Sequence, residues 1–231
     1  MSCDGILPAS GLAIRMRGLP KFLLPCTEDY ETLLERHINF MLESCEVVLV
    51  PIRPHLSHLL ESLNIANERV KVLPLETRSM TETVIMAAEF STADRIVIAM
   101  PDTYLSGEQP YDYLAHDRGT ISLALWQIRE DQKGKLGQVL LDETPQGKVS
   151  KSQDKDPSCE FPHSWGAMGL DRNMLELADP AMPHVGYLIA SALDKGFEVA
   201  GKEMQGKYFD CGTPSEYLQM LGEIIGTNQR H

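Results

Sequence analysis

Apolar runs of strand length alternate with helix-like segments through the first half of the chain, and this alternation constrains the fold more than any other feature. The runs that have strand character are Ile6–Ala9, Glu46–Ile52, Val70–Leu75 and Arg95–Met100. The segments with helical character are Glu28–Ser44, which Thr27 is placed to cap, Pro54–Leu63 and Thr81–Ser91. A β-α-β-α-β order predicts a parallel α/β sheet with right-handed crossovers, whose ligands lie at the carboxyl ends of the strands.

The second half of the chain alternates less regularly. The expected strands are Thr120–Ile128, Gly137–Asp142, Ser164–Leu170, Phe197–Glu203 and Tyr208–Cys211, and the expected helices are Tyr111–Asp117, Arg172–Ala178, His184–Lys195 and Pro214–Ile225. This order favours a mixed sheet, and Asp142–His163 is the most loop-like segment. At 231 residues the chain is expected to form a single domain over residues 1–231.

Charge and cysteine usage exclude several classes of partner. The formal net charge is −12, which argues against nucleic acid, because that affinity comes largely from Lys and Arg neutralising phosphates. No apolar run approaches a membrane span, and no basic segment typical of a secretory signal opens the chain. Five scattered cysteines without a C-x-x-C pair are typical of reduced thiols. We therefore expect a cytoplasmic protein with no membrane or nucleic-acid partner, and the sequence leaves open whether it forms a homo-oligomer.

The segment from Gly5 to Pro25 has the features of a nucleotide-binding loop. An apolar run leads into a turn of small residues (Pro8, Ala9, Ser10, Gly11), where backbone N–H groups can approach a phosphate chain closely. Arg15 and Lys21 follow the turn and supply the positive charge that a triphosphate needs. The segment matches neither G-x-x-x-x-G-K-[ST] nor a complete G-x-G-x-x-G.

Two carboxylates stand where strands are expected to end. Asp102 follows a buried strand, and Asp210 precedes a Gly-Thr-Pro turn into the last helix. A carboxylate at such a position is well placed to hold Mg²⁺ beneath phosphates. The alternative role of Asp102 is to stabilise a turn or cap a helix, and the sequence does not show that the two residues meet.

Three segments together resemble the sugar-phosphate nucleotidyltransferases. Ile6-Leu-Pro-Ala-Ser-Gly-Leu-Ala-Ile-Arg-Met16 with Leu19-Pro-Lys-Phe-Leu-Leu-Pro25 is similar to the family signature Ala-Gly-x-Gly-Thr-Arg-Met followed by Pro-Lys-x-Leu-Leu-Pro. Tyr208-Phe-Asp-Cys-Gly-Thr-Pro-Ser-Glu-Tyr217 resembles the closing segment, and Met100-Pro-Asp-Thr-Tyr104 resembles the central strand end. The matches keep the family's order. The resemblance implies a Rossmann-like three-layer α/β/α fold with a mainly parallel mixed central sheet.

The family's chemistry assigns roles to these residues. It implies transfer of NMP from a nucleoside triphosphate to a sugar 1-phosphate, which yields an NDP-sugar and pyrophosphate. The turn from Pro8 to Gly11 would cradle the triphosphate, Arg15 would bind the leaving pyrophosphate, and Lys21 would stabilise charge on the α-phosphate. Asp102 and Asp210 would hold Mg²⁺. Such a transfer needs positioning and charge neutralisation more than a protein nucleophile.

Four further residues take roles from the resemblance, and each has a structural alternative. Ser79 and Thr81 would contact the base or sugar of the nucleotide, or else cap a helix. Lys155, which follows Asp154 as in the family's Glu-Lys pair, would approach the sugar phosphate, although Lys151 competes for that role and either lysine could instead be a solvated loop residue. Gly166 would let the sugar lie against the backbone, or else be a plain strand glycine.

The sequence departs from the family pattern inside the first loop. Ala13 and Ile14 replace the second glycine and the threonine, which narrows backbone freedom and removes a hydroxyl. This departure keeps open a non-catalytic nucleotide-sugar-binding regulatory homologue. A nucleotide-sugar-dependent glycosyltransferase is a further alternative, but it usually has Asp-x-Asp where this chain has Asp102-Thr-Tyr. Other acceptors, such as phosphocholine or a polyol phosphate, also remain open.

Overall fold

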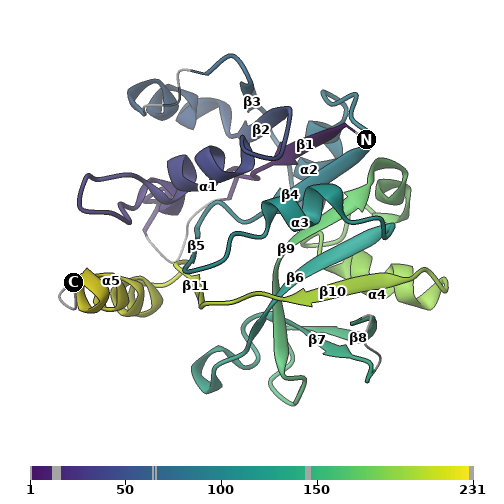
Figure 1. Cartoon of the computed structure of the whole chain (residues 1–231). Helices are drawn as coiled ribbons and strands as arrows, with labels where there is room; N and C mark the ends of the chain where they lie inside the picture. Colours follow the sequence, from purple (N-terminus) through teal and green to yellow (C-terminus); the bar gives the residue numbers. More distant parts are fainter. Residues whose placement is uncertain (1, 12–16, 64, 66, 144–146, 229–231) are drawn as a thin grey trace.

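A mixed sheet, nine-stranded over the described part of the chain, forms the centre of the molecule (Figure 1). The computed structural model describes residues 2–11, 17–63, 65, 67–143 and 147–228. The main path of the sheet is β10-β6-β9-β4-β1-β2-β3, and β7 and β8 extend it beside β9. The strands are β1 Cys3–Ile6, β2 Val47–Ile52, β3 Val70–Pro74, β4 Arg95–Ala99, β5 Thr103–Leu105, β6 Ile121–Gln127, β7 Gly137–Leu141, β8 Val149–Asp154, β9 His163–Asp171, β10 Val199–Glu203 and β11 Tyr208–Asp210.

Strand directions confirm the expected mainly parallel mixed sheet. Along the main path, β9 runs antiparallel to β4 and β6. The other neighbouring pairs on that path are parallel. β5 and β11 lie outside this sheet and form a separate antiparallel ribbon.

Helices cover both faces of the sheet and complete the three-layer α/β/α fold. The α-helices are α1 Leu33–Met41, α2 Met80–Ala88, α3 Tyr111–His116, α4 Tyr187–Asp194 and α5 Pro214–Asn228, and the 3-10 helices are η2 Lys21–Leu23, η3 Pro54–Ser62, η4 Glu130–Gln132 and η5 Arg172–Leu177. α1 and α3 share one apolar core with one face of the sheet, and α2 and α4 share a second core with the other face. α5 packs with β11 in a third, smaller core (Figure 1). None of the described helices has the length and apolar character needed to cross a membrane.

Polar residues explain where two elements differ from expectation. β1 begins at Cys3 and not at Ile6, because the buried carboxylate of Asp4 accepts hydrogen bonds from the Val47 N–H (3.1 Å) and the Ser91 hydroxyl (2.6 Å). A polar residue satisfied in this way does not interrupt a strand, although it interrupts the apolar pattern.

The first helix also starts later than predicted. α1 begins at Leu33, where Thr32 and Glu35 form a reciprocal capping box, so the assignment of Thr27 as its cap was wrong. Thr27 instead accepts a hydrogen bond from the Glu31 N–H in the preceding turn (3.0 Å).

Further differences concern short or polar segments. Pro54–Ser62 is a 3-10 helix, and the polar strand β8 lies inside the segment that was expected to be loop-like. The ribbon strand β5 was not expected. β5 pairs with β11 so that Asp210 lies opposite Thr103. This pairing brings together two segments that are about a hundred residues apart in the sequence.

Candidate active site

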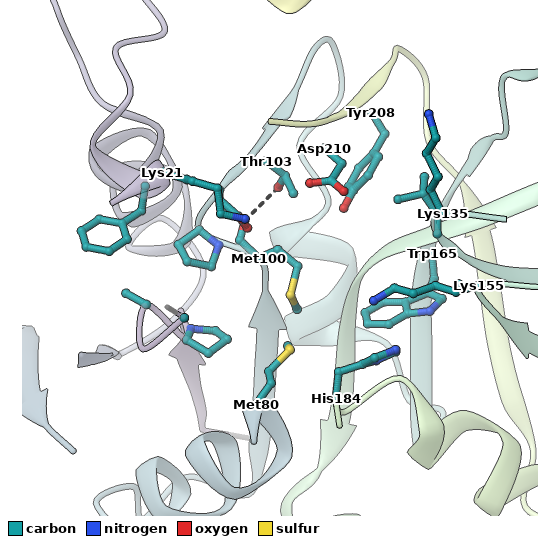
Figure 2. A pocket seen from close by; sticks show the side chains of 18 of the residues that line it. Lys21, Met80, Met100, Thr103, Lys135, Lys155, Trp165, His184, Tyr208 and Asp210 are labelled. Carbon is teal, nitrogen blue, oxygen red and sulfur yellow. Dashed lines mark hydrogen bonds and ion pairs between the residues drawn. The ribbon is translucent and has the colours of Figure 1, made fainter. Parts of the chain in front are cut away.

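A cleft of about 380 Å³ opens where β1 and β4 end, at the carboxyl edge of the parallel strands. One side comes from residues 8, 9, 11 and 20–22, and the other side comes from residues 135–137, 154, 155, 165 and 184. Residues 100–103, 208 and 210 lie between the two sides. Figure 2 shows Lys21 on one side, Lys155 with Trp165 on the other, and Asp210 between them. The position agrees with the rule that open α/β sheets bind ligands beyond the carboxyl ends of their strands.

Three charged residues from distant segments meet in this cleft. The Lys21 Nζ lies 2.5 Å from the Asp102 Oδ2, and the two side chains are 21% and 24% exposed. Asp102 immediately precedes β5, and the pairing of β5 with β11 sets Asp210 opposite Thr103. A Cβ added at Gly212 would lie 2.6 Å from the Asp210 Oδ1 and 3.2 Å from the Lys21 Nζ. The ammonium group therefore lies close to both carboxylates, and the glycine leaves room for this approach.

A buried histidine fixes the strand end that carries Asp102. The His37 Nε2–H donates to the Thr103 carbonyl oxygen at 2.8 Å, and the Nδ1 accepts from the Tyr111 hydroxyl. Burial lowers the pKa of His37 to about 4, so the ring is neutral at neutral pH and keeps this tautomer. His37 thus packs in the core and positions the residue that follows Asp102.

A second buried group fixes the strand that carries Asp210. The Glu216 carboxylate accepts the Asp210 N–H at 2.8 Å and pairs with Arg129 at 3.3 Å. Desolvation raises the pKa of Glu216. Arg129 also donates to the Tyr208 carbonyl oxygen at 2.8 Å. The backbone of β11 is therefore anchored from two directions.

The opposite side of the cleft contains a histidine and carboxylate pair. The His184 Nε2–H donates to the Asp154 Oδ2 at 2.6 Å, and the Gly186 N–H donates to the His184 Nδ1 at 3.1 Å. Because Nδ1 accepts a hydrogen bond, the ring donates through its Nε2–H in this arrangement. Lys155 follows Asp154 in a left-handed backbone conformation (φ 48°) and lines the cleft together with Lys135. This side therefore offers a fixed carboxylate and two ammonium groups.

The first loop reaches the cleft only in part. Pro8, Ala9 and Gly11 line it. Ser10 is buried beside it, where its hydroxyl shares a hydrogen bond with the Thr83 hydroxyl at 2.8 Å. Arg15, expected to bind the leaving pyrophosphate, lies outside the described residues, and so do positions 13 and 14.

Ser79 and Thr81 have local structural surroundings. Ser79 caps α2, accepting the Glu82 N–H at 2.9 Å and donating to the Pro180 carbonyl oxygen at 2.7 Å. Thr81 is fully buried, and its hydroxyl has no partner among the described residues. Neither is among the described residues that line the cleft, whereas Met80 between them is. The capping alternative therefore describes the observed contacts of Ser79.

Gly166 lies beneath an aromatic ring, outside the described residues that line the cleft. A Cβ at this position would lie 2.4 Å from the Tyr208 ring and 2.7 Å from Trp126. Its observed role is to let two aromatic rings pack on β9. Lys155 lines the cleft, whereas the competing Lys151 is exposed on β8.

Several lining residues were not predicted. Tyr208 could have been found from the two-residue period of β11, because alternate residues of a strand share a face and Asp210 was already a candidate. Lys135, Met80 and His184 gave no comparable signal. They enter the cleft through loops and helix ends whose course depends on tertiary packing.

Solved structures show what this fold is similar to. No family model matches the sequence, and curated proteins give no significant match. A protein from Bacillus anthracis assigned as a glucose-1-phosphate thymidylyltransferase, in complex with sucrose, has a TM-score of 0.81 at 16% identity, over 96% of this chain and 95% of that chain. The chain therefore has the same fold as this protein, a three-layer α/β/α fold with a mainly parallel mixed sheet.

Two further structures of this fold come from proteins with other substrates in their names. UTP-bound UGPase from Acinetobacter baumannii has a TM-score of 0.76 at 17% identity, over 99% of this chain and 98% of that chain. The inositol-1-phosphate CTP transferase from T. maritima has a TM-score of 0.75 at 15% identity, over 96% and 95%. At such identities the likeness establishes the fold. It does not determine which nucleotide base or which acceptor this chain binds.

Proposed function

We propose that this protein is a nucleotidyltransferase that transfers NMP from a nucleoside triphosphate to a sugar 1-phosphate and releases pyrophosphate. The observation that carries the proposal is the meeting of Lys21, Asp102 and Asp210 at the carboxyl edge of the sheet. Segments far apart in the sequence build one charged centre inside a cleft. The shared fold with nucleotidyltransferases supports the same reaction class.

The reaction needs few protein groups. An oxygen of the acceptor phosphate attacks the α-phosphorus of the triphosphate, the bond from the α-phosphorus to the bridging oxygen breaks, and pyrophosphate leaves with the electron pair. The attacking oxygen is already anionic, so no general base is required. Lys21 would stabilise the charge that develops on the α-phosphate, which is the main contribution a protein makes to such a transfer. Arg15, as the sequence implies, would hold the leaving pyrophosphate.

Asp102 and Asp210 are the residues that would hold Mg²⁺. Mg²⁺ is commonly bound by one or two carboxylates together with phosphate oxygens and water. Asp102 and Asp210 both line the cleft and are brought near one another by the β5–β11 pairing, so a site of two carboxylates completed by substrate oxygens and water fits these residues. The ion would supply charge neutralisation for the phosphates when bound.

The two sides of the cleft suggest where each substrate lies. The nucleotide would lie against the first loop at Pro8 to Gly11, and the acceptor would lie against Lys155, Asp154 and Trp165. An ammonium group suits the acceptor phosphate, whereas a fixed carboxylate suits hydroxyl groups of a sugar or polyol.

The cysteines bear on where the protein works. All five are buried and free of disulfide bonds, which supports a cytoplasmic setting.

A pyrophosphate-release assay tests the proposal. Purified protein with Mg²⁺ is given each of the four nucleoside triphosphates with glucose 1-phosphate, inositol 1-phosphate or phosphocholine. We expect pyrophosphate with at least one pair, and none when the acceptor is omitted. If no pair yields pyrophosphate and an NDP-sugar is bound without turnover, the regulatory homologue replaces the proposal. Sugar transfer from an NDP-sugar to an acceptor would favour the glycosyltransferase.

A further inference from the structure

Tyr208 is a buried phenol that the proposed reaction does not yet use. It is the first residue of β11, two positions before Asp210, so the two side chains share the strand face toward the cleft. The residue is 6% exposed. Figure 2 shows its ring beside Asp210, with the hydroxyl directed into the cleft.

The ring of Tyr208 is held firmly on the acceptor side. It packs on Trp126 at a centroid distance of 5.4 Å and covers Gly166, where a Cβ would lie 2.4 Å away. Its carbonyl oxygen accepts from the Arg129 Nη1 (2.8 Å) and the Gln132 Nε2 (3.0 Å). Gln132 belongs to the same segment that brings residues 135–137 into the cleft. The position of the hydroxyl is therefore set by the packing of the ring and by the hydrogen bonds of the backbone carbonyl.

The hydroxyl itself is not used by the fold. No described residue hydrogen-bonds with it, and Figure 2 shows it directed into the cleft that Tyr208 lines. A tyrosine hydroxyl carries its proton at neutral pH, so it can donate a hydrogen bond to an anion.

We infer that Tyr208 is a further substrate-binding residue, whose hydroxyl donates a hydrogen bond to the phosphate of the acceptor. The inference rests on the proposed function, because in-line attack requires that phosphate to lie between the charged centre and the acceptor side. Tyr208 stands at this boundary, with Asp210 on one side and Trp165 and Lys155 on the other (Figure 2). A nucleotide seated on the first loop would lie across the cleft from it.

The test is the variant Tyr208→Phe, which removes the hydroxyl and keeps the ring on Trp126. With the nucleotide and acceptor pair that gives the highest turnover, we expect the acceptor KM to rise about 10- to 100-fold, the effect of losing a hydrogen bond to a charged group. The nucleotide KM and the melting temperature should stay near those of the wild type. This split separates substrate binding from a structural role, which would move both KM values or the melting temperature. An unchanged acceptor KM would overturn the inference.

Tyr113→Phe is the matched control, because it removes a tyrosine hydroxyl on α3 outside the cleft, where the ring contacts Lys202. It should leave both KM values unchanged. If the wild type releases no pyrophosphate with any pair, the proposed function fails on its own, and calorimetric titration with inorganic phosphate and Mg²⁺ then tests Tyr208. Weaker phosphate binding by Tyr208→Phe than by the wild type would support the contact, and equal binding would refute it.

Discussion

Replacing Lys21 with methionine removes one charge from the centre of the cleft and keeps most of the side-chain volume. In the free protein, Lys21 pairs with Asp102 at 2.5 Å, but 21% and 24% of the two side chains remain exposed. Solvent therefore screens the pair, and its loss should lower the free energy of unfolding by about 1 kcal/mol or less. For a domain of this size that is a fall in melting temperature of about 2–4 °C or less.

The effect on turnover should be far larger than the effect on stability. If Lys21 stabilises charge that develops on the α-phosphate, its removal resembles the loss of one oxyanion donor, which lowers kcat by about 100- to 1,000-fold. This corresponds to about 2.7–4 kcal/mol of transition-state stabilisation. The substrate KM values should change much less, because the interaction strengthens mainly in the transition state.

The measurements are continuous pyrophosphate release for kcat and KM, and circular dichroism for the melting temperature. Lys133→Met is a suitable control, because Lys133 pairs with surface carboxylates of Glu130 and Glu160 and does not line the cleft. It should keep wild-type kcat. If Lys21→Met retains more than about a tenth of the wild-type kcat, Lys21 contributes less than the about 2.7 kcal/mol expected of a transition-state contact. A large fall in melting temperature would instead show that the pair is mainly structural.

Three further predictions follow from the same geometry. Asp102→Asn should raise the Mg²⁺ concentration needed for half-maximal rate, whereas Asp112→Asn on the exposed face of α3 should not. Gly166→Ala should cost about 1–3 kcal/mol of unfolding free energy, because its Cβ would displace the Tyr208 ring. Since the folded-state pKa of His37 is about 4 and its usual value is 6.5, the stability it contributes is present above pH 6.5 and falls by about 2 kcal/mol between pH 7 and pH 5. The free energy of unfolding is measured by urea denaturation at several pH values. In His37→Gln it should fall less between pH 7 and pH 5 than in the wild type, and an equal fall would contradict the assignment.

The parallel core of the fold was predictable because its strands are nearly continuous apolar runs. β2 and β4 match their predicted segments closely, since both faces of these strands are covered by helices. β8 was not predicted as more than a strand end, because half of its residues are exposed and most of them are polar. β5 was missed because a three-residue strand contains too few residues to show a period.

The charged centre of the site was predicted residue by residue, but its geometry was not. Lys21, Asp102 and Asp210 each belong to a short segment with a recognisable order of residues. Their meeting depends on the β5–β11 ribbon, which joins segments about a hundred residues apart, and no local pattern contains that information. Ser79 shows the opposite case: its sequence position suggested a ligand contact, while its hydrogen bonds cap a helix.

The β5–β11 ribbon also explains the order of residues in β11. β11 has three residues, and each is constrained: Tyr208 packs on Trp126, Phe209 packs in the small core with α5, and the Asp210 N–H is held by Glu216. Alternation along the strand then turns Tyr208 and Asp210 to the cleft and Phe209 away from it. A one-residue shift in the pairing with β5 would reverse all three faces. The buried contacts of β11 therefore fix its register with β5, and this register places one carboxylate and one phenol in the cleft together.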